Sequence, residues 1–235
     1  MSQTQVKQYD FTLEEVQKLF AMQDTLNSYV HPEWKTQGFD WGLAIVDECM
    51  EIHDHLGWKW WKKDYQVGLT EANRKQIQLE VIDILHFVVS HDIELDYSAN
   101  LKDCVACFNS DEYSQDLTEA LEGIEACKAL GLLGEVCERW AGLAHSVGLT
   151  KDQILETYTQ KYVLNKFRQD HGYKTGEYCK EWHIDPEDGR GRFKCEDNWW
   201  LERVVDDLQL MSLPTTDEDV LYSRLKDLYN RRINQ

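Results

Sequence analysis

The hydrophobic positions of this 235-residue chain recur mostly at helical spacing. Thr12 followed by Glu15 forms a capping box, which opens a predicted helix over 12–30 with one apolar stripe. Similar stripes predict a helix over 40–56, capped by Asp40, and one that begins near Thr70 and continues past Ser90. The last of these is apolar nearly all round, which is typical of a central, buried helix.

The rest of the chain continues this pattern. The segment 98–114 is poorly patterned and is interpreted as a connection or an insertion. A loop is expected over 185–191, and the helices that follow it show no evident chemistry. Only three prolines occur, so the leading fold class is all-α, a helical bundle. The further predicted helices cover 115–130, 132–147, 150–170, 196–211 and 217–231.

Two acidic pairs interrupt the apolar helices. Glu48 and Glu51 are three residues apart, as are Glu80 and Asp83, so each pair lies on one helix face. A carboxylate rarely enters a core unless it is neutralised or meets a cation. Two such helices packed together would direct these oxygens to one point, which suits Mg²⁺. The acidic helices are therefore predicted to pack around a metal site.

A solvated surface is the competing interpretation of the second pair. It requires polar residues four and seven positions after Glu80, where the chain has Ile84 and Phe87. The functional interpretation is therefore favoured for this pair. His86, by contrast, is interpreted as a core histidine that bonds to a carboxylate or a carbonyl.

Two amides, Gln23 and Asn27, lie on the apolar stripe of the first helix. Either they hydrogen-bond to each other or to the backbone, as buried amides usually must, or they face a ligand with donors and acceptors of its own. The residues by themselves favour neither alternative.

The second predicted helix ends at Gly57, and Trp58-Lys59-Trp60-Trp61-Lys62-Lys63 follows. These residues either form a packed helix end whose lysines extend to water, or stack a base and hold phosphates. Their position directly after an acidic pair favours the second alternative, in which they bind a base and phosphates.

The helix predicted over 150–170 leads into a cationic loop over 168–176 that contains two glycines. Arg, Lys, Tyr and backbone N–H groups in such a loop can wrap phosphates. A charged helix face is more often exposed to solvent than used for binding. Here, however, tyrosines lie beside the charged face, which favours binding. The residues at near-helical spacing on it are Tyr158, Lys161, Asn165 and Arg168.

Composition narrows the function further. The formal net charge of −18 argues against general nucleic-acid binding, which depends on Lys and Arg, but it leaves room for a small anionic substrate. Seven cysteines, with no secretory signal and no membrane-spanning run, predict a reducing, cytoplasmic setting and no membrane. Cys104 and Cys107 are interpreted as one face of a helix rather than a zinc or redox site.

Four blocks of the chain, in order, resemble the dimeric (class 2) dUTPases of the all-α nucleoside-triphosphate pyrophosphatase superfamily, which also contains MazG-like enzymes and phage dCTPase-dUTPases. The last block is the one that singles out the dUTPase branch. The blocks are Gln23 to Asn27, Glu48-Cys49-Met50-Glu51 with Trp58-Lys59-Trp60-Trp61-Lys62, Glu80-Val81-Ile82-Asp83 with His86-Phe87, and Lys161 to Tyr178.

The resemblance implies hydrolysis of dUTP to dUMP and pyrophosphate in a homodimer, with more than one Mg²⁺ per site. It implies a catalytic domain over 1–182 and a helical extension over 183–235, in the cytoplasm, or the host cytoplasm for a phage-encoded protein. Glu51 would orient and deprotonate the attacking water. The metal ligands implied are Glu48, Glu51, Glu80 and Asp83. The substrate-binding residues implied are Gln23 and Asn27 for the uracil edge, Trp61 for stacking, Lys59, Lys62, Lys161, Arg168 and Lys174 for phosphates, and Asn165 and Tyr173 for deoxyribose or phosphates.

Three other functions compete with this one. The first is a broader pyrophosphatase acting on dCTP and dUTP or on NTPs generally, and dUDP is a further candidate substrate. The second is a non-catalytic helical protein that binds nucleotide or metal. The third is a purely structural dimer, which would show neither turnover nor stabilisation by nucleotide.

Overall fold

The computed structural model describes residues 9–96, 101–183 and 194–232. Nearly all regular structure in these ranges is helical, so the predicted all-α class is confirmed. The loop predicted over 185–191 lies outside the described residues. The α-helices are α1 (Leu13–Val30), α2 (Trp41–Leu56), α3 (Arg74–Glu94), α4 (Leu101–Phe108), α5 (Leu117–Leu130), α6 (Val136–Ser146), α7 (Lys151–Asp170), α8 (Asp197–Leu210) and α9 (Glu218–Arg232).

The chain forms two compact units, Met1–Leu155 and Glu156–Gln235. Helix α7 begins in the first unit and continues into the second. The predicted division after residue 182 separates a catalytic region from its extension, and it stays a prediction.

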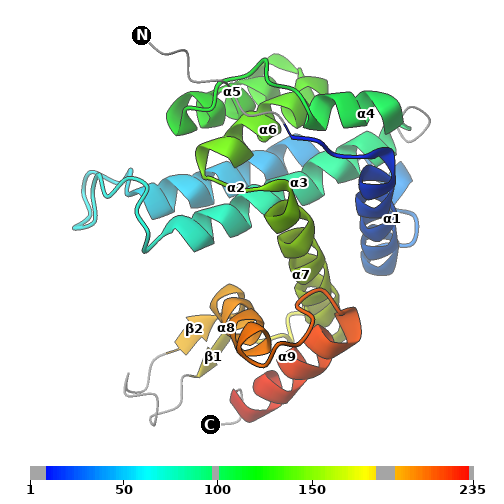
Figure 1. Cartoon of the computed structure of the whole chain (residues 1–235), viewed down its shortest axis with the longest axis vertical. Coiled ribbons are helices and arrows are strands. Elements are labelled where there is room, and N and C mark those ends of the chain that lie inside the picture. Colours follow the sequence, from blue (N-terminus) through cyan, green and yellow to red (C-terminus); the bar gives the residue numbers. More distant parts are fainter. Residues whose placement is uncertain (1–8, 97–100, 184–193, 233–235) are drawn as a thin grey trace. The chain divides into compact units, whose positions relative to one another are not determined.

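The first unit is built on α2 and α3, which pack side by side (Figure 1). Helices α1 and α6 also contact α3, while α5 contacts α2 and α6. The short 3₁₀ helices η1 (Trp34–Thr36) and η3 (Leu133–Glu135) lie between the longer helices in sequence. The apolar side chains at the centre of this unit include Ile45, Ile52, Ile77, Val81, Ile82, Ile84 and Leu85.

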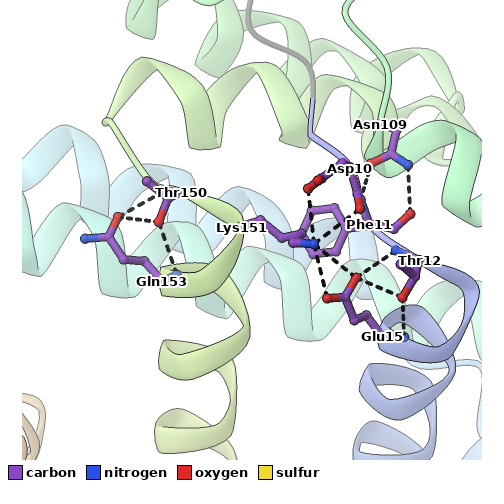
Figure 2. Close-up of polar contacts among 8 residues, drawn as sticks. All are labelled: Asp10, Phe11, Thr12, Glu15, Asn109, Thr150, Lys151 and Gln153. Atoms are coloured by element: carbon purple, nitrogen blue, oxygen red, sulfur yellow. Dashed lines mark hydrogen bonds and ion pairs between the residues drawn. The ribbon is translucent and has the colours of Figure 1, made fainter.

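The start of α1 is fixed by contacts from distant parts of the chain. The predicted Thr12–Glu15 capping box is present, and the Lys151 ammonium lies 3.1 Å from Asp10 Oδ1 and 3.2 Å from Glu15 Oε1. The Asn109 amide bonds both backbone groups of Phe11, as Figure 2 shows. The first turn of α7 therefore anchors α1, which carries the amides of interest.

The segment 98–114 differs from the sequence-based expectation of a simple connection. It contains α4, which buries Cys104 and Phe108. A helix of only eight residues shows too few repeats of its apolar positions to be recognised from its pattern. Cys104 and Cys107 both lie on this helix, as expected.

The second unit combines the rest of α7 with α8, α9 and a small sheet. Strands β1 (Glu181–His183) and β2 (Lys194–Glu196) pair antiparallel, with Trp182 opposite Cys195. Strands this short cannot show the alternation by which strands are predicted. The aromatic side chains buried in this unit include Phe167, Tyr178, Trp182, Trp200 and Tyr229.

None of the helices in the described ranges combines the length and the hydropathy that crossing a bilayer requires.

Candidate active site

Three carboxylates converge where α2 packs on α3. One ligand oxygen from each of Glu48, Glu80 and Asp83 lies within 4.8 Å of the others. The Glu80 side chain is only 3% exposed, and the other two residues are half-buried. Glu51, the fourth predicted ligand, is exposed on α2 and does not belong to this group. The structure thus brings together three of the four predicted metal ligands.

The neighbourhood of these carboxylates is strongly negative. His55 Nε2 lies 3.5 Å from Glu80 Oε1. This hydrogen bond raises the pKa of His55 against the opposing effect of burial, and the charges of Glu80, Glu51 and Asp54 raise it further. Carboxylates held this close repel one another, and a divalent cation relieves that repulsion. The all-oxygen donor set therefore fits a hard cation such as Mg²⁺.

The two amides of α1 are bonded to each other and to α3. Gln23 Nε2 donates to Asn27 Oδ1 and to Ser90 Oγ, both at 2.9 Å, and Asn27 Nδ2 also lies 2.9 Å from Ser90 Oγ. His86 Nδ1 lies 2.7 Å from Gln23 Oε1, so the prediction that His86 bonds a carbonyl oxygen is confirmed. Gln23 is buried and Asn27 is half-buried. Of the two alternatives, internal bonding is the one present in this structure.

A tight turn at Gly57 ends α2, and the aromatic and cationic segment follows it. Gly57 has a φ of +77°, and a Cβ atom here would lie 2.0 Å from the Asp64 carbonyl oxygen, so only glycine fits. Trp60 and Trp61 are 72% and 56% exposed, which excludes the packed helix end for these two rings. Lys62 is exposed, while the Lys59 ammonium contacts the Asp54 carboxylate.

The cationic residues of α7 are held within the second unit. Lys161 is fully buried, and its ammonium donates to Asn198 Oδ1 at 2.9 Å. Arg168 pairs with Asp197 and donates from Nη1 to Asn165 Oδ1 at 2.9 Å. Beyond the helix, Tyr173 and Lys174 are exposed, and the Arg168 guanidinium lies 5.9 Å from the centre of the Tyr173 ring.

A comparison with known families decides the identity of this arrangement. A family model described as dUTPase matches residues 15–173, which is most of the chain. The chain belongs to the dUTPase family. The resemblance to the class 2 dUTPases is therefore confirmed, and with it the function of a dUTP diphosphatase. No curated protein sequence matches the chain.

The most informative residue that the sequence did not reveal lies outside the matched region of this dUTPase. Asp197, at the start of α8, is fully buried and accepts hydrogen bonds from Arg168 and from the Tyr178 hydroxyl. Burial alone would raise the pKa of Asp197, but the Arg168 hydrogen bonds and charge, the Tyr178 hydroxyl and the Lys161 charge together lower it. In the sequence, Asp197 looks like the acidic residue that is common in the first turn of a helix. Its pairing with Arg168 cannot be recognised there, because the two residues are 29 positions apart.

The lowered pKa of Asp197 predicts how the stability of the dUTPase depends on pH. A carboxylate with a folded-state pKa below its ordinary 3.8 stabilises the fold above that pH, and this contribution disappears as the pH falls toward the folded-state pKa. We expect Asp197→Asn to lower the free energy of unfolding by about 3–5 kcal/mol at pH 7, because it removes the opposite charge that pairs with the largely buried Arg168 guanidinium.

Urea unfolding of the wild type and Asp197→Asn at pH 7, 5, 4 and 3 measures this effect. The difference between the two proteins should shrink only below about pH 4. Asp207→Asn, which removes an exposed partner of Arg203, should change the stability little at any pH. A difference that stays constant down to pH 3 would contradict the prediction.

Proposed function

We propose that this dUTPase depends on Mg²⁺ and hydrolyses dUTP to dUMP and pyrophosphate, with Glu48, Glu80 and Asp83 as its principal metal ligands. The observation that supports the metal most directly is the convergence of these three side chains, one of them almost fully buried. The membership of the family supports the substrate. More than one Mg²⁺ per site, with Glu51 as a further ligand, belongs to the same proposal.

In the proposed mechanism Glu51 orients the attacking water and accepts its proton. The water oxygen forms a bond to phosphorus, the phosphorus–oxygen bond to the leaving group breaks, and the proton passes to the Glu51 carboxylate. When bound, Mg²⁺ neutralises charge on the phosphate oxygens. Glu51 suits this role because it is exposed and one helical turn beyond Glu48.

The residues proposed to bind the nucleotide fall into two groups. The exposed ones, including Trp61 for the base and Lys62, Lys174 and Tyr173 for the phosphates or the sugar, are accessible as the structure stands. The others are less exposed and make hydrogen bonds or ion pairs within the protein, so they act in fixed positions or exchange partners when the nucleotide binds. These are Gln23 and Asn27 for the uracil edge, Lys59, Lys161 and Arg168 for the phosphates, and Asn165 for the sugar or the phosphates.

We also propose a homodimer in the cytoplasm. The dimer is supported by the resemblance to the class 2 dUTPases. The cytoplasmic location is supported by the seven cysteines, all of which are free thiols.

A substrate panel tests the proposed function. With Mg²⁺ present, we expect kcat/KM for dUTP to exceed the value for dCTP by at least about 10²-fold, because amides that hydrogen-bond uracil reject a base with different donors and acceptors. The panel also includes dTTP and UTP, whose bases present the same hydrogen-bonding edge as uracil. Pyrophosphate release is the measurement, with dUDP as an additional substrate and EDTA in place of Mg²⁺ as the control.

The competing functions give different results in the same panel. Similar kcat/KM values for several nucleotides would support the broader pyrophosphatase. Stabilisation by dUTP without pyrophosphate release would support a non-catalytic binder. A protein that dUTP neither stabilises nor reacts with would contradict both enzyme functions.

A further inference from the structure

The pairing of Arg168 with Asp197 has a specific geometry. Arg168 Nε donates to Asp197 Oδ2 and Nη2 donates to Oδ1, both at 2.8 Å, so the carboxylate holds one side of the guanidinium plane. The opposite nitrogen, Nη1, donates to Asn165 Oδ1 at 2.9 Å. Two parallel hydrogen bonds fix the orientation of the plane, which a single bond would not.

Asp197 is itself held rigidly. Its side chain is 0% exposed, and the Tyr178 hydroxyl donates to Oδ2 at 2.8 Å. The neighbouring Asn198 accepts a hydrogen bond from the Lys161 ammonium at 2.9 Å. The start of α8 thus holds the Arg168 and Lys161 side chains, which the proposed function assigns to the phosphates.

Burying a charged pair costs desolvation free energy, and replacing the pair by hydrophobic residues often leaves a protein equally stable or more stable. Such a pair is therefore weak evidence for a purely stabilising role. An arginine that is held in one orientation before the ligand arrives loses less conformational entropy on binding, which increases affinity. Pre-organisation is the benefit that this geometry offers.

We propose that Asp197 is a positioning residue for nucleotide binding. It holds Arg168 from one side and, through Arg168 Nη1, sets the orientation of the Asn165 amide. Asp197 does not itself touch the nucleotide. This inference rests on the proposed function, because that function assigns Arg168 and Asn165 to the substrate. It extends the functional site to residue 197, beyond the region that the family model matches.

The steady-state kinetics of Asp197→Asn with dUTP test the proposal. The variant keeps the shape of the side chain but loses its charge and presents an amide to Arg168. We expect KM to rise about 10- to 100-fold with a much smaller change in kcat, as is typical when the partner of a binding group is removed. Circular dichroism at the assay temperature establishes that each variant is folded.

Two further variants separate positioning from stability. Tyr178→Phe removes one donor to Asp197 and should raise KM by a smaller factor, about threefold, so the proposal remains testable if Asp197→Asn fails to fold. Asp207→Asn on the same helix should leave KM and kcat unchanged. Folded Asp197→Asn and Tyr178→Phe proteins with wild-type KM would overturn the proposal and leave Asp197 a structural role only.

A double-mutant cycle tests whether Asp197 acts through Arg168. We expect Arg168→Ala to raise KM, and Asp197→Asn to add little in the Arg168→Ala background. If the two substitutions raise KM independently, so that the factor for the double variant is the product of the two single factors, the proposal is overturned. If the wild type does not hydrolyse dUTP, or if Arg168→Ala leaves KM unchanged, the proposed function of these residues fails first. If only Asp197→Asn leaves KM unchanged, the present inference fails alone.

Discussion

Glu51→Gln is expected to reduce kcat for dUTP by about 10²- to 10⁴-fold while changing KM little. Glutamine keeps the size of the side chain and its ability to orient water, but it cannot accept the proton of the attacking water. Because Glu51 is exposed, the substitution should not disturb the core. Pyrophosphate release under saturating dUTP and Mg²⁺ measures kcat directly.

The matched control for Glu51→Gln is Asp47→Asn. Asp47 is an exposed carboxylate on the same helix, directly before Glu48 and about one turn before Glu51. It should retain wild-type kcat, which would show that the loss in Glu51→Gln is not a general effect of removing negative charge from α2. Full activity in Glu51→Gln would exclude Glu51 as the base.

Glu80→Gln is expected to have the second large effect. It removes one negative charge from the group formed with Glu48 and Asp83, so the Mg²⁺ concentration for half-maximal activity should rise at least about 10- to 100-fold. Repulsion within the group also decreases, so the metal-free variant should unfold at a temperature no lower than the wild type, provided that glutamine keeps the contact with His55.

Thermal unfolding with and without Mg²⁺ gives a measurement independent of activity. A ligand at one hundred times its Kd stabilises the folded protein by about 2.7 kcal/mol. We expect the wild type and Asp47→Asn to gain stability with Mg²⁺ and Glu80→Gln to gain much less. Equal stabilisation of all three proteins by Mg²⁺ would contradict the assignment of Glu80 as a metal ligand.

The sequence was most informative where a local rule determines local structure. The Thr12–Glu15 capping box forms as predicted, and Thr150 and Gln153 form the same kind of box at the start of α7, because the donors and acceptors are three residues apart. The start of α3 is less regular: Thr70 bonds Asn73 in a turn, and the helix begins only at Arg74. Helix α4 and the two strands were not predicted, because they are too short to show a repeated pattern of apolar and polar positions.

The acidic pairs show what helical spacing can and cannot predict about side-chain positions. It places Glu80 and Asp83 on one face of α3, and the apolar neighbours of Glu80 indicate that this face is buried. Spacing within α2 gives Glu48 and Glu51 the same relation, yet Glu48 joins the α3 carboxylates and Glu51 remains exposed. The difference depends on how α2 is rotated against α3, which packing determines.

The sequence by itself therefore determined the helical class, the principal caps, the family and the acidic faces, because these depend on residues within one or two helical turns. The tertiary structure decided which carboxylates converge, that Gln23 bonds His86 and Ser90, and that Asp197 pairs with Arg168. Those contacts join residues far apart in the chain. Their partners are selected by packing and by the need of each buried charge or amide for a hydrogen-bonding partner, which no local pattern encodes.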